Sequence, residues 1–197
     1  MLEYIIENEE RAAGNKVICG VDEAGCGCLC GRVYAAAVIL PEDYRNPELN
    51  DSKKLSEKKR EKLFADITEN ALAYGIAFAE VEEIERINIL NAAMLAMRRA
   101  VEALETPVDI ALIDGNTSRG FDCKTRTVVK GDSISPSIAA ASILAKVSRD
   151  KYICKLAEKY PQYGFEKHKG YCTKAHVEAI RAYGPCELHR PSFLKKI

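Results

Sequence analysis

Four carboxylates each lie at the end of an apolar, strand-like stretch of the sequence: Asp22, Glu23, Asp114 and Asp132. Carboxylates are costly to bury, and they seldom follow several such stretches by chance. If they meet at one edge of a sheet, they form an all-oxygen site suited to hard divalent cations. The pattern therefore predicts metal-dependent phosphoryl transfer.

Each carboxylate also has an ordinary structural interpretation. Asp22 and Glu23 could form an acidic pair in a surface turn, Asp114 could belong to an Asx-turn, and Asp132 could cap a helix. Adjacent residues of a strand also point to opposite faces, so the pair can reach one site only if the strand ends or bulges, which Gly25 permits. The metal-site hypothesis therefore depends on the four acids together.

Net charge gives no sign of a polyanionic partner, because 29 Lys and Arg balance 29 Asp and Glu. The distribution of charge is more informative. Basic residues recur in local groups at 53–54, 58–60 and 167–169. Basic groups around an acidic metal site suit a nucleic acid, although such groups more often cover solvated helix faces.

The sequence contains no apolar run long enough to cross a membrane, and its acidic beginning does not resemble a signal peptide. We therefore expect a cytoplasmic protein whose eight cysteines are free thiols. Cys26, Cys28 and Cys30 alternate in one short loop, which is not the paired spacing of zinc or iron–sulfur sites. Small residues in a tight loop are the favoured interpretation, with a thiol-metal or redox site as the competing one and a thiol nucleophile left open.

The order of expected elements indicates an α/β fold built around a mixed sheet. A glycine-rich turn separates the first two strands, and prolines or glycines end several elements. Strands are expected at 16–21, 33–40, 74–81, 108–113 and 125–130, and helices at 1–14, 56–71, 82–104, 135–160 and 173–183.

Five further residues are candidates for contacts with a nucleic acid. Ser52, Lys53 and Lys146 could meet phosphates. His168 and Tyr171 belong to a basic loop in which an aromatic ring could stack on a base or sugar. Ordinary loop packing and a solvated helix lysine are the competing interpretations.

Several ordered blocks of the sequence match one known family. They are VDEAG (21–25), VYAAAVIL (33–40), NDSKKLSEKKRE (50–61), LIDGN (112–116), VKGDSISPSIAAASILAKVSRD (129–150), YPQYGF (160–165), HKGYCTKAH (168–176) and HRPSF (189–193). Over residues 17–193 the chain resembles ribonuclease HII, the bacterial type 2 ribonuclease H family.

The resemblance implies a ribonuclease H-like fold, with a central five-stranded mixed sheet flanked by helices. It implies one catalytic domain over 1–197, with a lead-in helix at 1–15 and a substrate-contacting helix and tail at 165–197. The implied activity is endonucleolytic cleavage of the RNA strand of RNA–DNA hybrids. Members also cut 5′ of single ribonucleotides in duplex DNA, leaving 3′-hydroxyl and 5′-phosphate ends, and serve ribonucleotide removal and primer clearance. We expect a monomer with nucleic acid as its partner.

The family's metal-binding carboxylates correspond to Asp22, Glu23, Asp114 and Asp132. Two Mg²⁺ or Mn²⁺ ions, roughly 4 Å apart, would then straddle the scissile phosphate. One would orient and deprotonate water, and the other would stabilise the leaving 3′-oxygen. The family's tyrosine at the DNA–RNA junction corresponds to Tyr171.

The first loop, Gly25 to Arg32, departs from the family pattern. The family usually has Arg or Lys at the position of Cys26 and Pro at that of Arg32. The loop senses the ribose 2′-hydroxyl largely through backbone groups, which Gly25 and Gly27 can offer. The missing guanidinium removes about 1–3 kcal/mol of substrate binding unless Arg32 supplies the charge. The alternative function is therefore a hybrid-binding protein with impaired cleavage or altered substrate preference.

Overall fold

The computed structural model describes residues 2–195. One mixed sheet has the strand order β3-β2-β1-β4-β5, with β1 antiparallel to β2 and parallel to β4. The expected five-stranded mixed sheet is therefore confirmed. The first residue and the last two, which belong to the segments predicted at the two ends, lie outside the described residues. The strands are β1 (Ile18–Ala24), β2 (Val33–Ile39), β3 (Ala73–Ala79), β4 (Ile110–Asp114) and β5 (Lys124–Val128).

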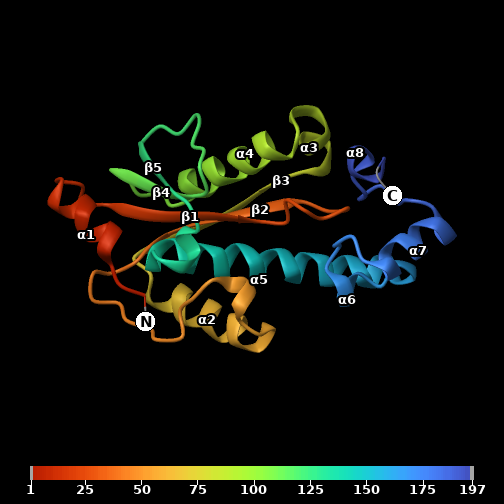
Figure 1. Ribbon diagram of the computed structural model, residues 1–197, viewed down its shortest axis with the longest axis horizontal. Helices are drawn as coiled ribbons and strands as arrows, with labels where there is room; N and C mark the ends of the chain where they lie inside the picture. Colours follow the sequence, from red (N-terminus) through yellow and green to blue (C-terminus); the bar gives the residue numbers. More distant parts are fainter. Residues whose placement is uncertain (1, 196–197) are drawn as a thin grey trace.

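Helices cover both faces of this sheet (Figure 1): α3 and α4 lie on one face, and α2 and α5 lie on the other. Short 3-10 turns precede α2, α5 and α6. The helices are α1 (Ile5–Ala12), α2 (Glu57–Asn70), α3 (Val81–Ile87), α4 (Ile89–Glu102), α5 (Pro136–Lys159), α6 (Phe165–His168), α7 (Lys174–Tyr183) and α8 (Pro191–Leu194).

The small residues at the start of α5 allow it to lie directly on the sheet. A Cβ atom at Gly20 of β1 would stand 2.1 Å from the carbonyl carbon of Ser137, so only glycine fits there. The run from Ala139 to Ala145 is buried against β2 residues such as Ala36. This close approach fixes the helix start, and with it the turn that precedes the helix.

The single helix expected over 82–104 is two helices, and the prediction is wrong at Asn88. This residue has φ +65°, a left-handed conformation that asparagine tolerates better than most residues. Its side chain accepts a hydrogen bond from the amide of Asn91 and caps α4. Leu90, in the first turn of α4, is 74% exposed, whereas Met97 is fully buried.

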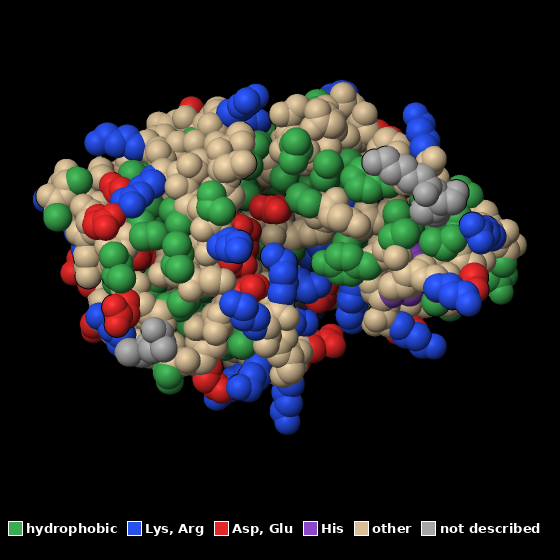
Figure 2. All heavy atoms as spheres, viewed as in Figure 1, with side chains coloured by type: hydrophobic (Ala, Val, Ile, Leu, Met, Phe, Trp, Pro, Cys, Tyr) green, Lys and Arg blue, Asp and Glu red, His purple; other side chains and the backbone are tan. Residues whose placement is uncertain are grey.

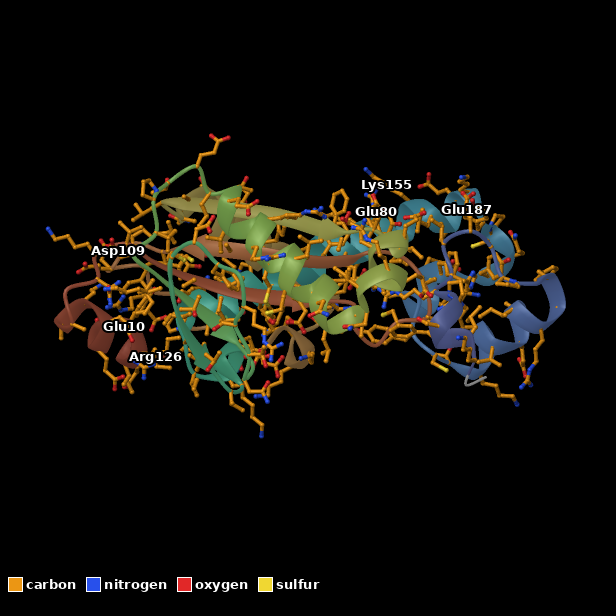
Figure 3. All side chains as sticks on the ribbon, turned by 90° about the horizontal axis from the view of Figure 1, so that it is seen from above. Glu10, Glu80, Asp109, Arg126, Lys155 and Glu187 are labelled. Carbon is orange, nitrogen blue, oxygen red and sulfur yellow. The ribbon has the colours of Figure 1, made fainter. Side chains whose placement is uncertain are left out.

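The lead-in helix α1 is anchored by a buried carboxylate. Glu7 accepts hydrogen bonds from the hydroxyls of Ser135 (2.6 Å) and Ser137 (2.7 Å) at the start of α5. Arg126 of β5 also pairs with Glu10 of α1 at 2.8 Å, and Figure 3 shows both residues at the same end of the sheet. The helix therefore connects the sheet edge to α5.

The C-terminal segment, residues 161–195, packs at the opposite end of the molecule from α1 (Figure 1). Two isolated β-bridges join it to the first loop, Cys28 with Tyr171 and Cys30 with His189. The short helices α6 and α8 were not predicted from the sequence. Within residues 2–195, no helix combines the length and apolar character needed to span a membrane.

Candidate active site

The open edge of β1 brings the first two acids together. Pairing between β1 and β4 ends at Val21 opposite Ile113. Asp22 and Glu23 lie one and two residues further on, where β1 continues in register with β2 as far as Ala24. The prediction that the strand itself ends or bulges there is wrong. Beyond Val21, the β4 side of β1 is therefore unpaired at Asp22 and Glu23.

The other two acids arrive at this edge from β4 and from the turn before α5. Asp114 is the last residue of β4, and Asp132 lies in the 3-10 turn Gly131–Ser133. The amide of Gly131 donates to Asp114 Oδ1 at 2.7 Å, which ties the turn to the end of the strand. The ammonium of Lys53 lies 3.9 Å from Asp132 Oδ2.

Burial and neighbouring carboxylates raise the pKa of three of these acids. Burial, followed by the charges of Glu23 and Asp114, raises the pKa of Asp22 well above its usual range. Burial and Asp114 likewise raise the pKa of Glu23, and burial, Asp51 and Asp114 raise that of Asp132. A nearby cation strongly stabilises the charged form of carboxylates that repel one another in this way.

These four side chains offer only oxygen donors, which suits Mg²⁺ or Mn²⁺. As placed, no three His, Cys, Asp or Glu side chains in residues 2–195 form a ready-made metal-binding group. The charge of Asp114 nevertheless acts on the other three acids. Their chemistry and mutual repulsion fit divalent cations.

A fifth carboxylate, Asp51, was missed by the sequence analysis. Its Oδ1 accepts a hydrogen bond from the amide of Lys53 at 2.9 Å, and its charge and hydrogen bond contribute to the raised pKa of Asp132. The side chain of Asp51 thereby helps to hold Lys53 beside Asp132.

Tyr171 presents its ring above two cations. It is 42% exposed, with the Lys146 ammonium 5.3 Å and the Arg149 guanidinium 5.9 Å from the ring centroid. The Lys146 ammonium also pairs with Asp150 at 2.8 Å. Lys146 thus supports Tyr171, and a phosphate contact by this lysine stays a prediction.

Two other residues predicted to contact the substrate, Ser52 and His168, form their hydrogen bonds within the protein. The Ser52 hydroxyl is buried, 2.8 Å from that of Ser142 on α5. His168 uses both ring nitrogens: Nε2 lies 2.9 Å from the Tyr163 carbonyl oxygen, and Nδ1 accepts from the amide of Gly170. The structure places both residues as supports for neighbouring segments.

The two unusual residues of the first loop, Cys26 and Arg32, make different contacts. The Cys26 thiol donates to Glu23 Oε1 at 3.6 Å, so the loop borders the acidic cluster. Arg32 makes a two-pronged ion pair with Glu80 at 2.9 and 2.6 Å and lies 4.0 Å from the ring centroid of Phe78. Arg32 therefore does not replace the charge missing at Cys26.

The thiols of the loop are poorly suited to soft-metal or redox chemistry. Burial raises the pKa of Cys30 to about 12 and also raises those of Cys26 and Cys28. A thiol with a raised pKa rarely forms the thiolate that binds metals or reacts. Cys28 and Cys30 are fully buried in the loop, and the interpretation as small packing residues stays the favoured one.

A groove of about 450 Å³ opens beside the acids, with Glu23, Cys26, Asp114, Asn88 and Arg119 among its lining residues. Figure 2 shows acidic side chains near the middle of one face of the molecule, with Lys and Arg on one side and apolar side chains on the other. This arrangement suits a polyanion lying across a cation site.

Comparisons with known proteins agree with this geometry. Residues 19–196 match the family model described as Ribonuclease HII. A curated Ribonuclease HII of Caldicellulosiruptor bescii is 52% identical over 194 residues, covering 98% of this chain and 94% of the relative. The solved PCNA:RNase HII complex of Archaeoglobus fulgidus has 25% identity and a TM-score of 0.76, with coverage of 89% and 94%. Bst-RNase HIII in complex with Mn²⁺ shares the fold at 18% identity and a TM-score of 0.65, with coverage of 85% and 63%. The chain therefore belongs to the ribonuclease HII family of metal-dependent ribonucleases H.

Proposed function

We propose that this hybrid-cleaving endoribonuclease also cuts 5′ of single ribonucleotides embedded in duplex DNA. The products would carry 3′-hydroxyl and 5′-phosphate ends. The observation that supports the proposal is the position of Asp114 at the end of β4, where its charge acts on Asp22, Glu23 and Asp132. The exposed ring of Tyr171 and the exposed backbone of Gly27 provide surfaces that can contact the sugar at a DNA–RNA junction.

The four carboxylates would hold two divalent cations, Mg²⁺ or Mn²⁺. The Mn²⁺ complex of Bst-RNase HIII supports the choice of a hard divalent ion. When bound, such cations supply the charge that activates water and stabilises a leaving 3′-oxygen. Burial and neighbouring negative charges raise the pKa of Asp22, Glu23 and Asp132, and bound cations would offset this unfavourable effect on the charged carboxylates.

The surrounding residues would bind and orient the nucleic acid. Lys53, held beside Asp132 by Asp51, would meet a phosphate next to the scissile one. Tyr171, supported by Lys146, would stack on the sugar at the junction. The backbone of the first loop would read the ribose 2′-hydroxyl, with Gly27 as its most open position.

The alternative, a hybrid-binding protein with impaired cleavage, has one observation in its favour. The Cys26 thiol occupies one oxygen of Glu23, a proposed metal ligand. A thiol hydrogen bond is weak compared with a carboxylate–cation contact, so a cation would displace it. Cleavage is therefore the favoured outcome.

The cellular roles that we propose are ribonucleotide removal from DNA and primer clearance. The Archaeoglobus fulgidus relative forms a complex with PCNA, which is consistent with work on replicating DNA. One catalytic domain, a monomeric state and a cytoplasmic location stay predictions.

The test is cleavage of a duplex with one ribonucleotide, beside an RNA–DNA hybrid, in Mg²⁺ and Mn²⁺ separately. We expect a cut 5′ of the lone ribonucleotide, no cut by Asp132→Asn, and normal cutting by Asp122→Asn, which alters an exposed carboxylate outside the acidic cluster. Cutting of the hybrid alone would refute the single-ribonucleotide proposal. Normal cutting by Asp132→Asn would refute the metal-site assignment, and binding without cutting would favour the alternative.

A further inference from the structure

Arg190 is fully buried, and no carboxylate pairs with it among residues 2–195. Its guanidinium donates instead to the backbone of the first loop. Nη1 lies 3.2 Å from the Cys26 carbonyl oxygen and 2.9 Å from that of Cys28. Nε and Nη2 lie 3.0 and 2.7 Å from that of Gly31. One side chain therefore fixes three peptide groups of a single loop.

These bonds decide which way one amide of the loop points. In a trans peptide the C=O and N–H groups point in opposite directions, and every described peptide bond is trans. Because Arg190 turns the Cys26 carbonyl inward, the N–H of Gly27 in the same peptide turns outward. Gly27 is exposed, and a Cβ there would meet no atom within 4 Å. Within the described part of the chain, no acceptor bonds this amide.

A second buried guanidinium, Arg149, lies under the same loop. It donates to the carbonyl oxygens of Lys169 at 2.9 Å and Cys30 at 3.4 Å, and it fills the space where a side chain at Gly25 would be. Arg149 and Arg190 are close enough that the charge of the first contributes to lowering the pKa of the second, after the larger effect of burial. Two positive charges thus lie under a loop whose side chains at 26, 28 and 30 are neutral thiols.

Burial of such charges without a counterion is expensive, and an apolar side chain would fill the same space at lower cost. The gain is a loop with a fixed shape and a positive potential. This potential acts through a region of low dielectric constant, next to the acidic cluster that Cys26 contacts through Glu23.

We propose that Arg190 is a positioning residue that turns the Gly27 amide toward the substrate as a donor to the ribose 2′-oxygen. Together with Arg149, it also supplies positive charge that the loop side chains lack. The inference rests on the proposed function and adds to it the residue that orients the loop amide.

The test is Arg190→Lys, which keeps the charge but replaces a planar fork of donors with a single nitrogen. The measurement is KM for a duplex with one ribonucleotide, compared with Ki for an all-DNA duplex of the same sequence used as a competitor. We expect the ratio Ki/KM to fall about tenfold, as the loss of one oriented hydrogen bond implies. The salt dependence of KM should not change, because the charge remains.

The matched control is Arg99→Lys. Arg99 also donates to a carbonyl oxygen, that of Phe78 at 3.0 Å, but its charge is paired with Glu83 and it lies on α4. This variant should keep the wild-type ratio. An unchanged ratio in a folded Arg190→Lys protein, with a wild-type circular dichroism spectrum, would overturn the proposal.

If Arg190→Lys fails to fold, Gly27→Pro provides the second test, since proline removes the amide N–H and leaves Arg190 in place. Gly27 has open space for a ring, and its φ is not in the left-handed region. A wild-type ratio in Gly27→Pro would also overturn the proposal, and a tenfold fall would support it. Wild-type protein is assayed first, so its failure to cut the ribonucleotide duplex would count against the proposed function instead.

Discussion

The Nε2 atoms of His176 and His189 lie 3.1 Å apart in the interior of the C-terminal segment. His176 Nδ1, 2.9 Å from the Tyr171 carbonyl oxygen, donates there, so its Nε2 accepts from His189. His189 Nδ1 in turn accepts from the amide of Cys186 at 3.0 Å. This network assigns both tautomers and requires both rings to be neutral. A proton added to His176 Nε2 would place two donors face to face at the histidine pair, and a proton added to His189 Nδ1 would face the donor amide of Cys186.

Acid should therefore destabilise the folded protein through these histidines. Burial lowers the pKa of His176 to about 4 and lowers that of His189 as well. The pKa of a histidine in the unfolded chain is about 6.5. Between these values the unfolded chain binds protons that the folded chain does not, so the free energy of unfolding falls as pH drops from about 6.5 to about 4.

Urea unfolding at pH 7.5, 5.5 and 4.5 measures this effect, with His176→Gln as the comparison. The glutamine amide can still donate to the Tyr171 carbonyl but does not titrate. The variant should lose less stability than the wild type over this range. Equal losses in both proteins would contradict the assignment.

The acidic cluster should destabilise the protein when metal is absent. The pKa of Asp22 is raised above its unfolded value, so the charged carboxylate opposes folding at neutral pH. The free energy of unfolding should therefore rise as pH falls and Asp22 takes up a proton. We expect Asp22→Asn to raise the melting temperature in EDTA and to abolish cleavage. The exposed-site variant Asp122→Asn should change neither.

Divalent cations should reverse this penalty in the wild-type protein. A ligand present at a hundred times its Kd adds about 2.7 kcal/mol to the free energy of unfolding. Thermal unfolding in EDTA, Mg²⁺ and Mn²⁺ measures the gain, which should shrink in Asp22→Asn. A melting temperature that neither ion changes would argue against binding at this cluster.

Cys26→Arg should restore a cation to the loop. The position borders the groove next to the acids, and a guanidinium there could contact one more phosphate. We expect a lower KM, and the slope of log KM against log salt concentration should steepen by about one unit. Leu72→Arg, at an exposed residue bonded to Ile39 at the other end of β2, is the control for added charge alone. Equal salt slopes in the two variants would show that position 26 does not face the substrate.

Glu7→Ala should loosen the contact between α1 and α5. The substitution leaves the buried hydroxyls of Ser135 and Ser137 without their acceptor, which should cost about 2 kcal/mol. The midpoint of urea unfolding should fall, whereas Glu3→Ala, at an exposed position, should leave it unchanged. A wild-type midpoint in Glu7→Ala would mean that the helix adds no stability through this carboxylate.

The sequence was sufficient to locate the carboxylates along the chain. Asp114 ends a strand and Asp132 precedes a long helix because charge rarely continues a buried apolar run. How Asp22 and Glu23 come to share a site was not predictable. It depends on where β4 parts from β1, and such a register is set by contacts distant in the sequence.

The buried arginines were also beyond sequence reasoning. Arginine is almost never fully buried unless it is paired, and the partners of Arg149 and Arg190 are backbone carbonyls, which every residue carries. The break at Asn88 was hidden for a similar reason. Apolar periodicity continues across it, and a single left-handed residue leaves no mark on that pattern.

The two β-bridges from the first loop to Tyr171 and His189 have a consequence for the order of events during synthesis. All the acids of the cluster leave the ribosome well before Arg190 is made. A growing chain can therefore assemble the sheet edge that attracts cations while the loop beside it still lacks its inner support. If Arg190 aims the loop as proposed, selectivity for the sugar would follow formation of this sheet edge.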